Sequence, residues 1–200
     1  MKRLLVDYGG VLTTSVIGSF KAFAHAEGVP PETFAALFAD DGARAEIHGL
    51  ETGRLSEPEF DRRFAARLGV DPERLLDRLF AGLEPEPAMI EAVRSARAAG
   101  ATTGVVSNSW GMRIYERVSL DGLFDTVVIS AEAGLRKPDP AIFLLAVERL
   151  GAGAEEYVFV DDLRWNCEAA AKLGMTPVLH RDVATTIAEL ERLLEVPLGR

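Results

Sequence analysis

The spacing of apolar residues divides the chain into two parts. Between residues 15 and 82 apolar side chains recur at helical spacing, for example at Phe34, Leu37 and Phe38. That stretch carries no run typical of a strand. After residue 87, short apolar runs alternate with helical stripes, and this alternation predicts a parallel sheet whose strands are connected by helices.

These patterns predict a fold of the α/β class. Strands are expected at residues 4–6, 103–107, 126–130, 157–161 and 176–180, with helices at 88–99, 141–150, 167–173 and 185–194. The simplest architecture is a doubly wound five-stranded parallel sheet, a Rossmann-like core, with a small all-helical cap inserted after the first strand. The core is predicted to comprise residues 1–14 and 86–200 and the cap residues 15–85, with a frayed tail at 196–200.

Local signals predict helix boundaries inside the cap. Ser56, with Glu59 three residues later, indicates a capping box at the start of a helix that Gly69 ends. Asp71 and Pro72 are expected to begin the next helix.

The charge balance narrows the range of partners. Lys and Arg total 22 against 31 Asp and Glu, a formal net charge of -9, so the overall field repels nucleic acid and anionic membranes. The single cysteine, Cys167, excludes an internal disulfide and fits a reducing compartment. Because no apolar stretch is long enough for a signal peptide or a membrane span, we expect a cytoplasmic protein. We further expect a monomer or homodimer whose partner is a small molecule.

Polar residues stand at several strand ends and in one loop of the predicted sheet. In chain order these are Asp7 with Gly9 and Gly10, Ser107 with Asn108, Lys137, and Asp161 with Asp162. Taken singly, Asp7 fits a turn and Lys137 an exposed loop position. Because the carboxyl ends of parallel strands lie at one edge of a sheet, the whole set is expected to converge there.

The adjacent acids Asp161 and Asp162 carry the strongest chemical signal. Two neighbouring carboxylates at the end of a buried strand repel each other, and burying either one without a cation is unfavourable. We therefore expect a metal ion or a basic group beside them. A site with oxygen ligands alone indicates Mg²⁺ rather than zinc.

Four motifs, in order along the chain, resemble those of the haloacid dehalogenase-like hydrolase superfamily. They are DYGGVL from Asp7, VVSNS from Val105, GLRKPDPAIF from Gly134 and FVDDLRWN from Phe159. The resemblance covers essentially the whole chain, and the helical insertion is similar to the small cap of the branch that includes the phosphatase domain of soluble epoxide hydrolases. It implies a sheet with the first strand in the centre, beside the second and the fourth.

The resemblance also implies a magnesium-dependent phosphatase of small phosphorylated metabolites that acts through an aspartyl-phosphate. Asp7 would be the nucleophile, Ser107 would donate a hydrogen bond to a phosphoryl oxygen, and Lys137 would neutralise charge. The substrate would be held by Gly10, Ser107, Asn108 and Lys137, and Mg²⁺ by Asp7, Asp161, Asp162 and the Gly9 carbonyl. Asn166 would orient the loop of the fourth motif.

Gly9 departs from the family pattern. Most phosphatases of the superfamily have a second aspartate there as general acid and base, and losing such help typically lowers the rate about 10²–10⁴-fold. We therefore expect a slow enzyme or one that prefers good leaving groups, with Tyr8 packing rather than replacing the acid. Two alternatives stay open: a metal-independent 2-haloacid dehalogenase, which the Asp161-Asp162 pair argues against, and a catalytically weak or inactive binding protein.

Overall fold

One sheet of five parallel strands forms the centre of the computed structural model, which describes residues 3–30 and 32–199. The strands are β1 (Arg3–Val6), β2 (Thr103–Ser107), β3 (Thr126–Ile129), β4 (Tyr157–Asp161) and β5 (Thr176–Leu179), in the spatial order β3-β2-β1-β4-β5. β1 is central, with Leu5 opposite Gly104 on one side and Phe159 on the other. The predicted strands and their neighbours are confirmed.

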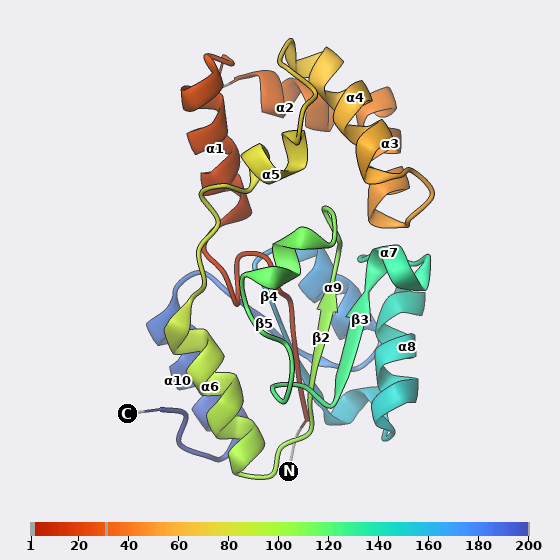
Figure 1. Cartoon of the computed structure of the whole chain (residues 1–200). Coiled ribbons are helices and arrows are strands. Elements are labelled where there is room, and N and C mark those ends of the chain that lie inside the picture. The colour runs from red at the N-terminus through yellow and green to blue at the C-terminus, as the bar shows by residue number, and fades with distance from the viewer. Residues whose placement is uncertain (1–2, 31, 200) are drawn as a thin grey trace.

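Helices cover both faces of this sheet (Figure 1). On one face α6 (Pro87–Ala98) packs against α10 (Val183–Leu194), and on the other lie α8 (Pro140–Leu150) and α9 (Arg164–Lys172). Successive side chains of a strand point to opposite faces, so Leu5 belongs to one apolar cluster while Leu4 and Val6 belong to the other. Both faces are buried, which is why the strands read as continuous apolar runs.

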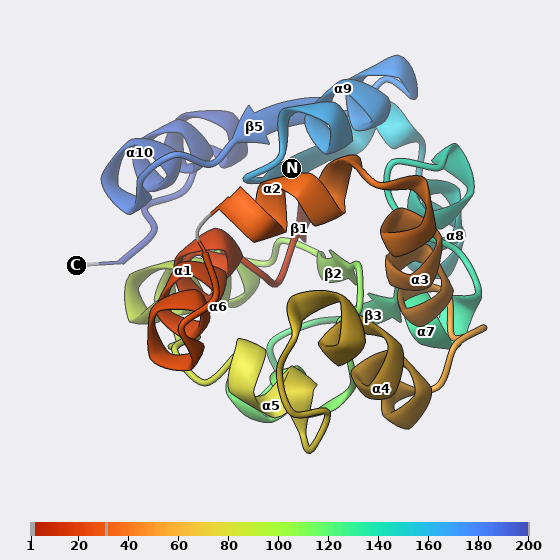
Figure 2. The ribbon, with the colours of Figure 1, turned by 90° about the horizontal axis from the view of Figure 1, so that it is seen from above.

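Five helices lie above the carboxyl ends of the strands (Figures 1 and 2). They are α1 (Val16–Glu27), α2 (Glu32–Ala39), α3 (Asp41–Glu51), α4 (Glu57–Leu68) and α5 (Leu75–Leu79), here called the helical layer. Short helical turns elsewhere are η1 (Arg113–Glu116), α7 (Ser130–Ala133) and η2 (Ala154–Glu156). The division into a core and a cap domain stays a prediction. Among the described residues no helix is both long and apolar enough to cross a membrane.

Aromatic packing joins the helical layer to the sheet. The Trp110 ring, from the loop after β2, lies between 5.3 and 6.5 Å from the ring centroids of Phe20, Phe60, Phe64 and Phe80. The chain enters and leaves the layer side by side, since the Thr14 amide donates to the Glu84 carbonyl at 2.8 Å. Two adjacent connections and one aromatic cluster therefore hold the layer over the strand ends.

Of the two helix starts predicted in this layer, the one at Ser56 is confirmed without its capping box, and the one at Asp71 is wrong. Ser56 stands at the N-cap of α4, but within the described residues its side chain makes no capping hydrogen bond, and Glu59 pairs with neighbouring arginines instead of reaching back. The helix expected from Asp71 begins only at Leu75, because the Asp71 carboxylate accepts the Glu73 amide hydrogen at 2.7 Å and forms a turn. Side-chain hydrogen bonds of this kind compete with helix initiation.

The end of the chain is better ordered than predicted. Leu198 is 1% exposed, and its amide donates to the Glu191 carboxylate at 2.8 Å. Leu198 and the half-buried Val196 therefore pack against the apolar core, so this part of the tail does not fray as predicted. Arg200 lies outside the described residues. Helix α9 also begins three residues earlier than predicted, at Arg164.

Candidate active site

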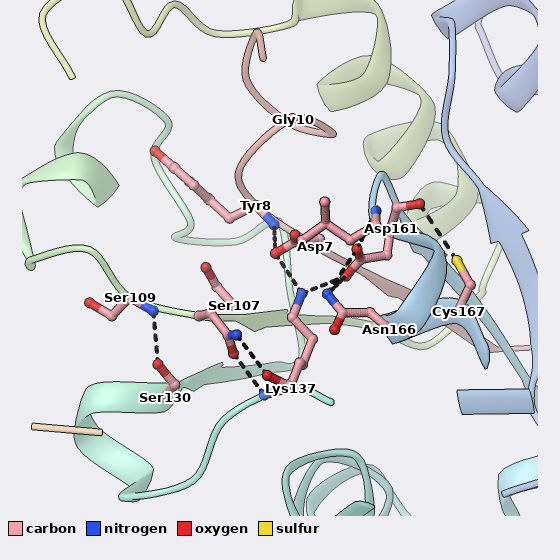
Figure 3. A network of polar contacts seen from close by, with 12 residues as sticks. Asp7, Tyr8, Gly10, Ser107, Ser109, Ser130, Lys137, Asp161, Asn166 and Cys167 are labelled. Atoms are coloured by element: carbon pink, nitrogen blue, oxygen red, sulfur yellow. Dashed lines mark hydrogen bonds and ion pairs between the residues drawn. The ribbon is translucent and has the colours of Figure 1, made fainter. Parts of the chain in front are cut away.

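Two acids and a lysine meet at the carboxyl edge of the sheet (Figure 3). Asp7 directly follows β1, Asp161 ends β4, and Lys137 comes from the loop between α7 and α8. The Lys137 Nζ atom lies 2.8 Å from Asp7 Oδ1 and 2.7 Å from Asp161 Oδ2. The Lys137 and Asp161 side chains are both 0% exposed, so each provides the countercharge that the other needs in the interior.

The carboxylate of Asp162 completes this group. Asp7, Asp161 and Asp162 each offer an oxygen atom, and these three atoms lie within 4.8 Å of one another. We call Asp7, Lys137, Asp161 and Asp162 the acid–lysine centre. The sequence predicted that Asp7, Lys137 and Asp162 would converge with Ser107 at this edge, and the structure brings these three together with Asp161.

Neighbouring groups fix the two most buried acids of the acid–lysine centre. The Tyr8 amide donates to Asp7 Oδ1 at 2.7 Å, and the Leu163 amide donates to Asp161 Oδ1 at 2.8 Å. Asn166 Nδ2 donates to both oxygens of Asp161, at 3.0 and 3.1 Å. This contact fits the orienting function expected of Asn166. The buried Oδ1 atom of Asn166 has no hydrogen-bond partner in the described part of the chain, so one acceptor beside the centre stays open.

The electrostatics of the acid–lysine centre favour a further cation. Burial raises the pKa of Asp7 to about 8; Lys137 opposes this shift, and Asp161 and Asp162 add to it. Burial and the Asp161 charge raise the pKa of Asp162 to about 6. Burial would lower the pKa of Lys137, but the carboxylates of Asp161 and Asp7 outweigh it and the pKa is raised. Three acids that share one ammonium, with oxygen donors alone, fit a site for Mg²⁺.

The remaining predicted residues frame this centre. Ser107 ends β2 and is buried. The side chain of Asn108 binds the backbone of Lys137 in both directions, donating to its carbonyl at 2.9 Å and accepting from its amide at 2.8 Å. A Cβ atom on Gly10 would lie 2.4 Å from Asp162 Oδ2, and its φ of +76° favours glycine, so the first loop passes directly against the acid pair. Gly9 is half-buried in the same turn.

The two tyrosines near the centre have different surroundings. Tyr8 is fully buried and its hydroxyl donates to the Ile114 carbonyl at 2.6 Å, so it packs as expected. Tyr115, in η1, donates its hydroxyl hydrogen to Ser107 Oγ at 2.8 Å. Nothing in the spacing of apolar residues marks Tyr115, because the loop that carries it is irregular. The one available signal is its place shortly after the VVSNS motif.

Glu51 connects the helical layer to the neighbourhood of the centre. This residue ends α3, is 5% exposed, and pairs through Oε2 with Arg136 Nε at 2.5 Å. Its carbonyl accepts the hydroxyl of Ser130, whose oxygen accepts the Ser109 amide hydrogen at 2.8 Å. Burial raises the pKa of Glu51, and Arg136 opposes the shift. The sequence pattern did not single out Glu51, because its partner lies 85 residues away.

Comparisons with known proteins agree with this geometry. Residues 1–174 match the model of the haloacid dehalogenase-like hydrolase family. The chain is 36% identical over 128 residues to a glyceraldehyde 3-phosphate phosphatase of Methanopyrus kandleri. This alignment covers 58% of this chain and 55% of that protein. It is 32% identical over 117 residues to bifunctional epoxide hydrolase 2 of Sus scrofa, covering 55% of this chain and 21% of that protein.

Two further matches bear on the chemistry and the fold. The chain is 30% identical over 105 residues to an (S)-2-haloacid dehalogenase of Pseudomonas putida, covering 51% of this chain and 46% of that protein. The chain is also similar to the solved structure of an enzyme of this family from Bacteroides thetaiotaomicron in complex with magnesium and inorganic phosphate. The TM-score is 0.68 at 23% identity, and the match covers 90% of this chain and 94% of that one. That likeness shows the fold. The alignments span from 21% to 55% of the length of these curated relatives.

Proposed function

This chain belongs to the haloacid dehalogenase-like hydrolase family, and from that premise we propose that it is a magnesium-dependent phosphatase of small phosphorylated metabolites. One observation carries the proposal: three carboxylate oxygens lie within 4.8 Å of one another, and a buried lysine ammonium bridges two of those acids. A phosphatase among the relatives supports the reaction class.

Asp7 is the proposed nucleophile. Its Oδ1 atom accepts hydrogen bonds from the Tyr8 amide and from Lys137, while among the described residues no hydrogen bond engages Oδ2. Oδ2 would attack phosphorus, the bond from phosphorus to the leaving oxygen would break, and the leaving group would depart with that electron pair. Water would then attack the phosphorus of the aspartyl-phosphate and release inorganic phosphate and the Asp7 carboxylate.

The other residues would stabilise charge around the phosphoryl group. Lys137 would neutralise the oxygens it faces, and the Ser107 hydroxyl would donate a hydrogen bond to one of them. Asp7, Asp161, Asp162 and the Gly9 carbonyl would hold Mg²⁺, which supplies positive charge that favours the ionised Asp7 and offsets charge on the phosphoryl group. Asn108 would act through its hold on the Lys137 backbone and through its own backbone near the substrate.

Gly9 limits the substrates that this centre can turn over. It supplies no general acid, and the Tyr8 hydroxyl is already committed to the Ile114 carbonyl. A leaving group must therefore depart without a proton from either residue, which favours acyl, aryl or anomeric sugar phosphates. An aspartate at position 9 would also require Val16 to shift, because a Cβ atom there would meet Val16 Cγ2 at 2.9 Å.

A second candidate is a 2-haloacid dehalogenase. Gly9 favours it, because those enzymes also lack the second aspartate, and one such enzyme is among the relatives. The third carboxylate argues against it: a displacement at carbon without a metal makes no use of Asp162 crowded against Asp7 and Asp161. An inactive binding protein stays the third hypothesis.

Turnover assays separate these hypotheses. We expect hydrolysis of p-nitrophenyl phosphate and acetyl phosphate with Mg²⁺, loss of that activity in EDTA, and loss in Asp7→Asn, while Asp121→Asn at an exposed position keeps it. Halide release from 2-chloropropionate without metal would favour the dehalogenase. No turnover together with no Mg²⁺ binding would favour the inactive protein, and full activity in Asp7→Asn would refute the nucleophile assignment.

A further inference from the structure

We propose that Tyr115 is a positioning residue that holds the Ser107 hydroxyl so that its hydrogen faces the phosphoryl group. The inference rests on the proposed function of the acid–lysine centre and adds a residue outside the four motifs. It starts from a single contact, the 2.8 Å hydrogen bond between Tyr115 Oη and Ser107 Oγ.

The surrounding structure holds the Tyr115 ring in place. Its centroid lies 4.8 Å from that of Tyr8, with an interplanar angle of 61°, which is a favourable edge contact. Tyr8 is itself fixed by the bond from its hydroxyl to the carbonyl of Ile114, the residue before Tyr115. The segment that carries Tyr115 is thus hydrogen-bonded to Tyr8, the residue after Asp7. The Tyr115 hydroxyl therefore has a defined position beside Ser107.

The donor and acceptor properties of the three groups fix the direction of the hydrogen bonds. Phosphoryl oxygens only accept, so with a substrate present Ser107 must give them its one hydroxyl hydrogen. The lone pairs of Ser107 Oγ then face Tyr115, which must be the donor to Ser107. A chain of two hydroxyls polarises its members, so the donated bond also strengthens the one from Ser107 to the phosphoryl group.

Tyr115 suits this function because it keeps its hydrogen. Burial raises the pKa of Tyr115, and the nearby Asp7 charge adds to the shift. The hydroxyl therefore stays a donor throughout the range in which a phosphatase is assayed. Phenylalanine at this position preserves the ring contact with Tyr8 and removes only the hydroxyl, whose side-chain partners are Ser107 and Ser109.

A double-mutant cycle on kcat/KM tests the inference. Tyr115→Phe should lower kcat/KM for p-nitrophenyl phosphate about tenfold, the typical effect of one hydrogen bond. Ser107→Ala should lower it about 100-fold or more, as expected for one donor to the reacting group. In the Ser107→Ala background the further effect of Tyr115→Phe should be less than about twofold, because the bond that it removes no longer exists. An undiminished tenfold loss in that background would overturn the inference.

A matched control separates positioning from packing. Tyr157 is a buried tyrosine at the opposite end of the sheet, where its hydroxyl donates to the Gly151 carbonyl. Tyr157→Phe should lower the melting temperature at least as much as Tyr115→Phe and leave kcat/KM unchanged. If both variants lower kcat/KM in proportion to their stability, Tyr115 is structural and the inference fails.

Binding of inorganic phosphate, with Mg²⁺ present, separates this inference from the proposed function. Should the wild type bind phosphate without hydrolysing any ester or anhydride, the proposed function fails and the inference is still tested. The single variant Tyr115→Phe must then bind phosphate more weakly than the wild type. The double variant must bind phosphate as tightly as Ser107→Ala does. Equal affinity of wild type and Tyr115→Phe, or no phosphate binding at all, would overturn the inference.

Discussion

The acid–lysine centre and the helical layer are built in opposite ways. At the centre, Asp161 receives hydrogen bonds from a backbone amide, a side-chain amide and a lysine, and it is 0% exposed. The helical layer reaches the rest of the protein through aromatic contacts around Trp110, through paired connections at residues 12–14 and 84–86, and through ion pairs such as Glu51 with Arg136. Directional bonds hold the centre in one arrangement, whereas the layer is held by ring packing together with polar contacts such as the ion pair of Asp77 with Arg113.

This difference suggests separate tasks for the two regions. Strand ends hold reacting groups at fixed distances, which catalysis requires. We predict that the layer, which lies over the strand ends, governs access to them. Glu51 is one contact between the layer and the neighbourhood of the centre, because it belongs to α3 and pairs with Arg136, the residue before Lys137. The following variants and conditions test whether the regions are as independent as this comparison implies.

The largest effect is expected when Lys137 is replaced by methionine. Without its ammonium, three carboxylates face one another in the interior, so the free energy of unfolding in metal-free buffer should fall by about 3–5 kcal/mol. The catalytic rate should fall about 10³-fold. Urea denaturation and p-nitrophenyl phosphate turnover measure the two effects. Lys172→Met, at an exposed position on α9, is the control and should change neither. A stable and active Lys137→Met protein would show that the centre does not depend on its lysine.

Trp110→Ala should weaken the helical layer and spare the centre. Removing this half-buried ring from the aromatic cluster should lower the free energy of unfolding by about 2–4 kcal/mol. Affinity for Mg²⁺, measured by titration calorimetry below the melting temperature, should stay within about twofold of the wild type, because the ligands lie on the sheet. A tenfold loss of affinity for Mg²⁺ would show that the layer shapes the metal site and that the two regions are not separate.

The pH dependence of stability should report on Asp7. Its pKa is raised from 3.8 to about 8, so the folded protein binds this proton more tightly than the unfolded chain. Stability from this residue is therefore fully present below pH 3.8 and lost as the pH rises through about 8. Between pH 6 and 8 the metal-free wild type should lose up to about 1.4 kcal/mol per pH unit relative to Asp7→Asn.

Magnesium provides the counterpart of that measurement. Because Mg²⁺ binds the ionised carboxylates, it should reduce or reverse the fall in the free energy of unfolding of the wild type between pH 6 and 8. It should have little effect on that of Asp7→Asn. Parallel stability curves for the two proteins, with or without Mg²⁺, would contradict the raised pKa of Asp7.

The smallest effect is expected for Glu51→Gln. The amide keeps one hydrogen bond to Arg136 and loses the charge, so the free energy of unfolding should fall by about 1–2 kcal/mol. KM should change by a few-fold, with kcat nearly unchanged, since the contact joins the layer to the centre without touching the reacting groups. Glu59→Gln, in a surface pair with Arg63, is the control and should be neutral. A large loss of kcat in Glu51→Gln would place this residue in the reaction itself.

The sequence predicted the sheet and the convergence at its edge for the same physical reason. Strands buried on both faces must be apolar, so Asp7 and Asp161 stand out where their strands end, and parallel strands bring such ends together. The loop residue Lys137 needed the family resemblance as well, because a lone loop lysine is usually exposed. Its 1% exposure follows from two acids that lie far from it in the sequence.

What escaped prediction depends on contacts between irregular segments. Tyr115 and Glu51 contact residues beside the centre, Ser107 and Arg136, from a helical turn and from the end of α3, and these partners follow no periodic pattern. The same holds for Leu198, which packs only because the folded chain leaves a buried place for it. Spacing in the sequence predicts elements and their ends, but the packing of loops against a finished sheet requires the three-dimensional structure.

Acid-quench mass spectrometry during turnover tests the central claim most directly. With acetyl phosphate and Mg²⁺, the peptide that contains Asp7 should gain the mass of one phosphoryl group within a single turnover and lose it as inorganic phosphate appears. Asp7→Asn should show neither the modified peptide nor the product. Phosphate released at the wild-type rate with no phosphorylated Asp7, or a phosphoryl group found on another residue, would contradict a nucleophilic Asp7 at the edge of the sheet.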